Sequence, residues 1–383
     1  MARYLAEKNN SHDVGNYINP RADFKAAATG AFSFSGSTRK NPRGMSQVRQ
    51  PWNRRFFSMT STLEPSQRVR VYYLSSGVIG APILDALLLD ERIELVGIGS
   101  QPDRPSGRRQ TMTPTAFAAY ALSRGCQIER IGSVNAPQFS EHLAALGVEL
   151  LLVVAFGQLL REKLLNQPRF GCLNVHASLL PRYRGACPIS AAILNGDGIT
   201  GVSFMRMDKG LDTGPVYCSC QLEIGSNETA GQLEERLGHL AAINCGDVIW
   251  GIARQGLQPE PQPASDEPNV HKISKNDGAI NWSLSATRIF NMVRAYQPWP
   301  RAFTFVPVQG VMKRIQVTSA TAEPDHGMAL EPGQVLADSA DELCIACNPG
   351  ILRIHRIIPE GRKEMPARDF LRGNPVTPGC VLE

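Results

Sequence analysis

The unbroken apolar run Leu150-Leu-Leu-Val-Val154 limits the possible folds of this chain more than any other stretch. A strand that is apolar on both faces is typical of the centre of a parallel sheet. Two further runs, Val69–Leu74 and Ile93–Ile98, predict additional strands, with a helix over Ala81–Leu89 between them. Strands that alternate with helices predict an open α/β sheet, whose site lies beyond the carboxyl ends of the strands.

Length and charge restrict the classes of function. The 383 residues suffice for two domains, and no apolar run approaches the roughly 20 residues that span a membrane, so we expect no membrane contact. The net charge of +5 arises near the N-terminus, because residues 1–67 hold ten Lys or Arg and four acidic residues. From position 68 onward 30 basic residues face 31 acidic ones. Any nucleic-acid-binding surface must therefore be local.

Cysteine usage indicates a reducing compartment. The nine cysteines form an odd set without framework spacing, which favours reduced thiols and argues against a zinc site.

Residues 1–67 predict a disordered extension, because they lack periodicity and are rich in Ser, Asn, Gly and Arg. They fit either an organellar targeting sequence or an extension ahead of an internal start such as Met45 or Met59. Three acidic residues among the first 25 count against targeting. We therefore expect a cytoplasmic protein, with a mitochondrial or plastid location as the alternative if residues 1–58 are a transit peptide.

Asn174, His176 and Asp212 are the candidate catalytic residues. Asn174 and His176 alternate with apolar neighbours, so both point to the same face of an extended segment. Asp212 follows 36 positions after His176, in a Gly-Leu-Asp-Thr-Gly turn. An amide can donate to an oxyanion, an imidazole can donate or exchange a proton, and a carboxylate can accept one. This combination predicts an acyl-type transfer.

Simpler interpretations explain less of the sequence. His176 alone could be a hydrogen-bonded core histidine and Asp212 a turn residue, but Asn174 then has no role. The Asp-Thr-Gly triplet at Asp212 also matches half of an aspartic protease site, which needs two carboxylates, and no second copy is present. The segment Ser76–Ala81 supplies only Gly-x-x-Gly of a dinucleotide-binding loop, without a convincing acidic partner, so we do not expect an NAD site.

The rest of the chain predicts a linker and a small β-barrel. Helical spacing of apolar residues indicates a long helix over 231–254, and a stretch rich in Pro and Gln follows it. A short helix is expected around 286–296, and the strands of the barrel at 302–306, 313–318, 333–337, 342–346 and 351–357. We divide the chain into an extension (1–67), a first domain (68–254), a linker (255–270) and a second domain (271–383).

Several motifs together identify a family. The motif Asn-x-His-x-Ser-Leu-Leu-Pro-x-Tyr-Arg-Gly begins at Asn174, and the other motifs are Gly210–Gly214, Gln101–Gly107, Val153–Gly157, Ile280–Ser285 and Arg294–Pro300. From about Arg68 to the C-terminus the chain resembles the folate-dependent formyltransferases, most closely those that act on methionyl-tRNA. The motif at Asn174 is shared with formyltransferases of small amines and sugars, whereas the last two segments resemble the second domain of the tRNA branch.

This resemblance implies a fold and a reaction. It implies a Rossmann-like formyltransferase domain with an open parallel sheet, followed by a C-terminal OB-like β-barrel domain. The reaction would move the formyl group of 10-formyltetrahydrofolate to the α-amine of initiator methionyl-tRNA, without a metal. Asn174 and His176 would stabilise the oxyanion, and Asp212 would accept the amine's proton. The folate side would be shaped by the turn of Ser178, Leu179, Leu180 and Pro181.

The resemblance also implies contacts with tRNA. In the family, the loop that corresponds to Gln101–Thr113 approaches the acceptor arm, and guanidinium groups suit phosphate contact. The candidates are Arg104, Arg108 and Arg109 on this loop, and Arg353, Arg356, Arg362 and Lys363 on the second domain. Both groups could instead be ordinary solvated surface, because Glu360 and Glu364 are interleaved with the second one.

Two other functions are compatible with these motifs. A formyltransferase of a small amine would not need the segment 280–300 or the barrel. A catalytically silent RNA-binding protein on this fold would not need the three candidate catalytic residues.

One loop departs from the pattern of the family. The family usually has Gly-Thr-Pro where this chain has Ser76-Gly-Val78, so the resemblance does not imply the contacts of that loop. We expect a monomer.

Overall fold

The computed structural model describes residues 64–107, 110–324, 330–336 and 342–382, which belong to one compact unit. Arg108, Arg109 and positions 1–63 of the expected extension lie outside the described residues. The last residues of that extension are described, since Pro65–Gln67 forms a short 3-10 helix, η1. The backbone carbonyl of Gln67 accepts a hydrogen bond from Arg254 at 3.3 Å, so the end of the extension contacts the first domain.

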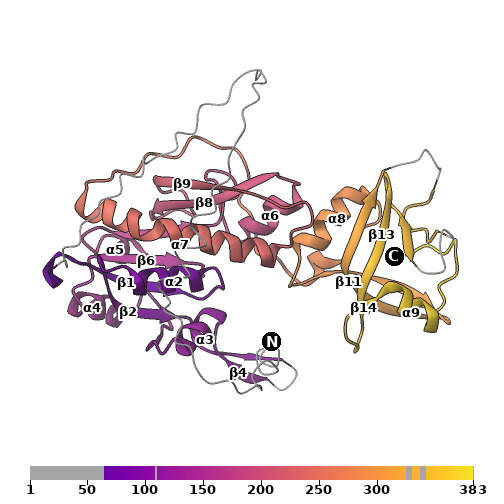
Figure 1. Ribbon diagram of the computed structural model, residues 1–383, viewed down its shortest axis with the longest axis horizontal. Coiled ribbons are helices and arrows are strands. Elements are labelled where there is room, and N and C mark those ends of the chain that lie inside the picture. The colour runs from indigo at the N-terminus through magenta and orange to yellow at the C-terminus, as the bar shows by residue number, and fades with distance from the viewer. Residues whose placement is uncertain (1–63, 108–109, 325–329, 337–341, 383) are drawn as a thin grey trace, which may run out of the picture. The chain divides into compact units, whose positions relative to one another are not determined.

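A seven-stranded sheet organises the first domain, in the order β5-β2-β1-β6-β7-β8-β9 (Figure 1). The first five strands in this order are parallel, and β8 and β9 continue the sheet in the antiparallel sense. The strands are β1 (Val69–Ser75), β2 (Ile93–Ser100), β5 (Glu129–Arg130), β6 (Leu150–Val154), β7 (Cys172–His176), β8 (Ile199–Arg206) and β9 (Val216–Glu223). The expected open α/β sheet is confirmed, and every residue of the central β6 is buried.

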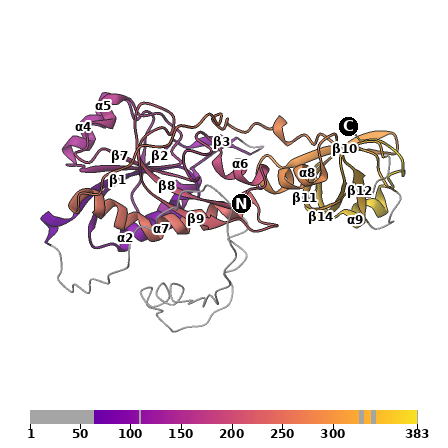
Figure 2. The same cartoon turned by 90° about the horizontal axis from the view of Figure 1, so that it is seen from above.

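Helices cover both faces of this sheet, with α4 and α5 on one side and α2 and α7 on the other (Figure 2). Alternate residues of the central strands β1 and β6 enter two different cores. Tyr73 and Leu152 share a core with α2 and α7, whereas Tyr72 and Leu151 pack with Phe139 of α4. The helices are α2 (Gly80–Leu89), α3 (Ala116–Ser123), α4 (Pro137–Ala145), α5 (Glu162–Leu165), α6 (Pro188–Leu194) and α7 (Ala230–Arg254).

An antiparallel sheet forms the second domain, in the order β10-β11-β13-β12 with β14 beside β13. Register shifts between Val317 and Ala320 allow β11 to bend, which fits the expected OB-like domain. The strands are β10 (Ala302–Val308), β11 (Val311–Glu323), β12 (Leu343–Ala346), β13 (Ile351–Pro359) and β14 (Met365–Pro366). The other elements are η2 (Asn276–Gly278), α8 (Ala286–Ala295) and α9 (Ala367–Gly373).

The strand expected at 333–337 differs in the structure. Its described part forms only two isolated bridges, Gln334 with Val381 and Val335 with Ile345. Gly333 has a φ of 88°, outside the β region, which ends any strand at its N-terminal side. Positions 337–341 lie outside the described residues.

The linker (255–270) runs along the first domain without forming a helix or a named strand. It is tied by isolated bridges at two points, Glu260 with Val216 and Val270 with Gly185. No helix in the described part of the chain is long and apolar enough to cross a membrane. No disulfide bond joins any of the nine cysteines, all of which lie in the described part of the chain. That the thiols are reduced in the cell stays a prediction.

Candidate active site

β7 and the loop between β8 and β9 bring the three candidate catalytic residues together. Asn174 and His176 occupy alternate positions of β7, which lies between the parallel β6 and the antiparallel β8. The register pairs His176 with Ser203 of β8. Asp212 belongs to the connection from β8 to β9, which we call the Asp212 loop (residues 207–215), and has a left-handed backbone conformation with a φ of 53°.

The Asp212 carboxylate lies between the other two side chains. Its Oδ2 is 3.6 Å from His176 Nδ1, and its Oδ1 is 3.5 Å from Asn174 Nδ2. The backbone N–H of Gly185 donates to the same Oδ2 at 2.9 Å. The side chains of His176 and Asp212 are only 7% and 16% exposed. The carboxylate is therefore fixed by one short hydrogen bond, while two longer contacts leave it able to receive a proton from a bound group.

His176 presents its Nδ1 atom to the site. Its Nε2 lies 2.9 Å from the backbone carbonyl of Tyr183. Because a carbonyl only accepts, Nε2 is assigned the hydrogen and donates it. Nδ1 is then the nitrogen that can exchange a proton or, when protonated, donate to an oxyanion or to Asp212.

Two serines build the turn that follows β7. The fully buried Ser178 donates from Oγ to the carbonyl of Arg182 at 2.6 Å. Ser203 Oγ donates to the carbonyl of Ser178 at 2.7 Å and accepts from the N–H of Leu180 at 3.1 Å. Ser178 thus stabilises the turn from inside, whereas the next three residues are half-buried: Leu179, Leu180 and Pro181.

Gln262 of the linker contacts the Asp212 loop, and no sequence pattern singled it out. Its Nε2 donates to the carbonyls of Asp212 and Gly214, at 2.8 and 2.7 Å. Its Oε1 accepts two hydrogen bonds from the guanidinium of Arg184, at 2.9 and 2.7 Å. Arg184 belongs to the Tyr-Arg-Gly end of the motif at Asn174, but its partner lies 78 positions away.

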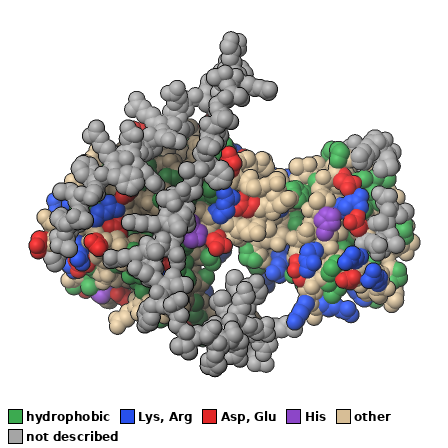
Figure 3. Space-filling view, in the orientation of Figure 1, with side chains coloured by type: hydrophobic (Ala, Val, Ile, Leu, Met, Phe, Trp, Pro, Cys, Tyr) green, Lys and Arg blue, Asp and Glu red, His purple; other side chains and the backbone are tan. Residues whose placement is uncertain are grey.

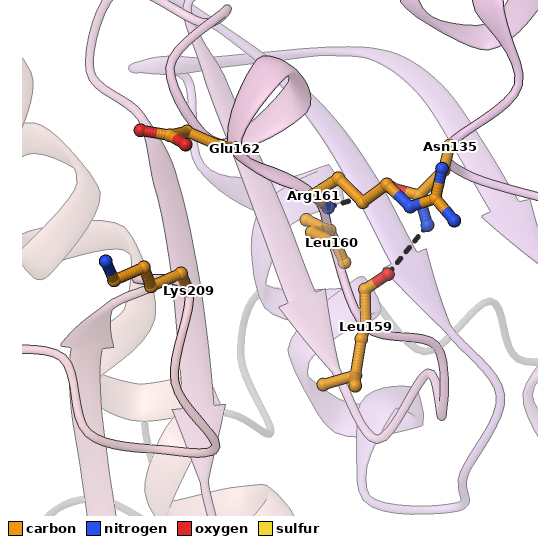
Figure 4. Close-up of a pocket in the computed structure, with 6 residues that line it drawn as sticks. All are labelled: Asn135, Leu159, Leu160, Arg161, Glu162 and Lys209. Carbon is orange, nitrogen blue, oxygen red and sulfur yellow. Dashed lines mark hydrogen bonds between the residues drawn. The ribbon is translucent and has the colours of Figure 1, made fainter.

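A cavity of about 490 Å³ borders the Asp212 loop. Lys209 of that loop lies on one side, and Leu159 and Arg161, which precede α5, lie on the other (Figure 4). Asn135 fixes the backbone on this second side, because its side chain donates to the carbonyl of Leu159 and accepts from the N–H of Arg161, both at 2.8 Å. The remaining lining residues are Leu160 and Glu162. Two cations and one acid give this cavity a positive balance.

Two of the basic candidates on the second domain are already paired. Arg353 is half-buried and forms ion pairs with Glu323 and Glu342. Arg356 pairs with Glu364 at 3.3 Å. Basic and acidic side chains also alternate on the face of the second domain that Figure 3 shows. The charge available to a polyanion is therefore smaller than the number of basic residues indicates.

The other described candidates are exposed. Arg362 and Lys363 lie between β13 and β14. Arg104 begins β3 (Arg104–Ser106), which pairs with β4 (Thr111–Thr113), and it donates to Gln101 Oε1 at 2.5 Å. The structure therefore brings the three catalytic candidates together, whereas the basic candidates are divided between the two domains.

The three side chains of the site suit acyl transfer. An amide, an imidazole and a carboxylate meet around one partly buried position. Within the residues that the structure describes, no group of three His, Cys, Asp or Glu side chains is placed to hold a metal ion. That the reaction needs no metal stays a prediction.

Comparisons with known proteins agree with this chemistry. The formyl transferase family model matches residues 68–248, and the model of the formyl transferase C-terminal domain matches residues 272–375. A methionyl-tRNA formyltransferase of Xylella fastidiosa (strain 9a5c) is 39% identical over 306 residues, which cover 79% of this chain and 97% of that protein. One of Citrifermentans bemidjiense is 37% identical over 315 residues, 82% of this chain and 96% of that protein.

Solved structures support the fold. An N-formyltransferase from Helicobacter canadensis, in complex with folinic acid and dTDP-3-aminofucose, has a TM-score of 0.55 at 16% identity and covers 78% of this chain and 100% of that one. HypX from Aquifex aeolicus, in complex with tetrahydrofolic acid, has a TM-score of 0.53 at 15% identity and covers 79% of this chain and 47% of that one. At these identities the likeness concerns the fold alone.

Proposed function

The chain belongs to the methionyl-tRNA formyltransferase family, and we propose that its site transfers the formyl group of 10-formyltetrahydrofolate to the α-amine of initiator methionyl-tRNA. The observation that carries this proposal is the position of the Asp212 carboxylate between Asn174 and His176. The solved structures with folinic acid and tetrahydrofolic acid share the fold and support a tetrahydrofolate-type donor.

The three side chains divide the chemistry among them. A free α-amine has a pKa of about 8, so part of it is neutral at pH 7 and can attack the formyl carbon. Asn174 Nδ2 and protonated His176 Nδ1 donate to the oxyanion that forms, and Asp212 accepts the proton that the amine loses. Collapse of the intermediate breaks the bond from carbon to the donor's nitrogen. The proton that Asp212 accepted is passed to that nitrogen, so the protein returns to its starting protonation state and the reaction balances.

The cavity beside the Asp212 loop is our candidate for the donor's far end. A folate ends in a glutamate, and the carboxylates of this group match Lys209 and Arg161 at the cavity. The half-buried Leu179, Leu180 and Pro181 would shape the folate side nearer the reacting carbon. Ser178 would act indirectly, by holding their turn.

Lys209→Ala tests this placement. We expect the KM for the formyl donor to rise about two- to fivefold, the effect of one solvent-exposed ion pair of up to about 1 kcal/mol, with kcat nearly unchanged. Steady-state kinetics with varied donor measure both constants. The matched control is Lys163→Ala, which removes an exposed lysine of α5 that does not line the cavity. Equal KM values in both variants would contradict the placement.

For tRNA, we propose that Arg362 and Lys363 supply charge on the second domain, with Arg104 on the first domain nearer the reacting end. We keep Arg108 and Arg109 as candidate tRNA contacts on the basis of the sequence. We expect Arg353 and Arg356 to contribute less to tRNA binding, because carboxylates already pair with them. Phosphate contacts by exposed cations are formed at the expense of bound counterions, so they make affinity depend on salt.

Replacing Arg362 and Lys363 by alanine should weaken tRNA binding and reduce the slope of log K against log salt by about one to two units. We expect kcat at saturating tRNA to change little, since neither residue lies at the three catalytic side chains. Salt-titrated binding measures the slope. A control with the same charge change is Lys163→Ala with Arg169→Ala, both exposed on the first domain. The same slope in both double variants would identify Arg362 and Lys363 as ordinary surface.

Formylation of methionyl-tRNA by the purified protein is the direct test of the proposed function. We expect a formyl group on the α-amine and tetrahydrofolate as the second product. Transfer only to a small amine would identify a different acceptor, and tRNA binding without transfer would identify a silent RNA-binding protein. The cytoplasmic location and the monomeric state stay predictions.

A further inference from the structure

The backbone of Asp212 has a conformation that its own sequence does not enforce. Its φ of 53° lies in the left-handed region, which aspartate adopts more readily than most residues but which is still sparsely populated, so the surrounding contacts help to hold it. This conformation directs the carboxylate toward His176 and Asn174. Whatever holds the backbone at this residue therefore also sets the position of the proton acceptor.

The linker supplies two hydrogen bonds at this point. Both come from the side-chain amide nitrogen of Gln262, one to the carbonyl of Asp212 at 2.8 Å and one to that of Gly214 at 2.7 Å. One side chain thus bridges the residue before and the residue after Thr213. A bridge of this kind limits the rotation of the backbone on both sides of that residue.

The amide of Gln262 is itself oriented from the opposite end. Its Oε1 accepts from Nε and Nη2 of Arg184, which fixes which end of the amide carries the oxygen. The next residue, Gly185, donates its N–H to Asp212 Oδ2. Arg184 and Gly185 therefore hold the same aspartate twice, through the linker at its backbone and directly at its carboxylate.

Backbone hydrogen bonds hold the linker against the first domain on both sides of Gln262. Glu260 exchanges two backbone hydrogen bonds with Val216, both at 2.8 Å, and Val270 donates to the carbonyl of Arg184 at 2.7 Å. Gln262 lies between these two attachments. Gly185 has no side chain where the linker passes, and a Cβ there would approach the carbonyl oxygen of Val270 to 2.4 Å.

We propose that Gln262 is a positioning residue for Asp212, and that the linker is in this way a functional part of the active site. Gln262 does not touch the reacting atoms. It acts through the two carbonyl groups, and the kinetic consequence rests on the proposed formyl transfer.

Gln262→Glu is the sharpest test, because it keeps the shape and both acceptor contacts to Arg184 while it replaces the two donors by an oxygen. We expect kcat to fall about 10- to 100-fold, as for a reacting group that is displaced by about 1 Å. The KM values for donor and tRNA should stay within about twofold. A purely structural defect would instead lower the melting temperature and the fraction of active protein.

The matched control is Gln258→Glu, an exposed glutamine of the same linker whose Nε2 contacts only the carbonyl of Gly256 in the linker itself. It adds the same charge and should leave kcat unchanged. Gln262→Met serves as a second variant, with similar length and no charge, and should lower kcat to a similar extent. If Gln262→Glu folds poorly, the methionine variant carries the test.

Hydrogen exchange followed by mass spectrometry gives a measurement that does not depend on activity. Peptides that cover the Asp212 loop and Gly185 should exchange faster in both Gln262 variants than in the wild type, while peptides of β6 should not change. Unchanged exchange together with unchanged kcat would overturn the proposal. If the wild type transfers no formyl group, the proposed function fails, and exchange alone then decides whether Gln262 holds the loop.

Discussion

Asp212→Asn is expected to lower kcat about 10²- to 10⁴-fold, the usual contribution of a positioned acid–base group. The change is nearly isosteric, and asparagine tolerates the left-handed backbone conformation of this position, so the fold should persist. The asparagine oxygen can still accept from Gly185, but the amide cannot take a proton from the attacking amine. The loss should therefore appear in kcat, with a small effect on KM.

Single-turnover and steady-state kinetics with methionyl-tRNA measure this effect, and the melting temperature checks the fold. Asp247→Asn is a suitable control, since it neutralises a carboxylate on α7 whose side chain is 76% exposed. We expect no change in kcat for that variant. Turnover of Asp212→Asn within tenfold of the wild type would show that another group accepts the proton.

Asn174→Ala is expected to lower kcat about 10²- to 10³-fold, as does the removal of one oxyanion donor elsewhere. The backbone of Asn174 pairs with Val153 and Met205 on the neighbouring strands, and this pairing does not need the side chain. The melting temperature should therefore change little. The same kinetic assay measures the loss, which lies in the transition state if the KM for the donor stays constant.

Asn174→Asp shows whether activity depends on the N–H groups of the side chain or only on its size. It keeps the size of the side chain, removes the two N–H groups and places a second carboxylate within reach of Asp212. We expect a loss at least as large as that of the alanine variant. If the aspartate variant were nearly as active as the wild type, Asn174 could not be an oxyanion donor.

The parts of the site that could be predicted from the sequence depend on local patterns. The apolar run 150–154 indicated the central strand, and the alternation around Asn174 and His176 indicated a shared face. Both are properties of consecutive residues in one strand. The pattern could not indicate that β8 continues the sheet in the antiparallel sense, because the direction of a strand follows from its partner.

The parts that could not be predicted depend on long-range contacts. Gln262 lies in a segment whose composition is typical of a flexible connection, and its partner Asp212 is 50 positions earlier. Arg353 looked available for RNA, but its partner Glu323 is 30 positions away. In both cases the side chain's role depends on a residue that no spacing rule connects to it.

The attachment of the linker at Val270 changes where the catalytic module ends. A fragment that stops at Arg254 contains Asn174, His176 and Asp212, but it lacks Gln262 and the hydrogen bonds of Val270. During synthesis, the chain must therefore extend past position 270 before the carboxylate acquires its final support. Fusions, domain exchanges and circular permutations should treat this segment as indivisible from the module that precedes it.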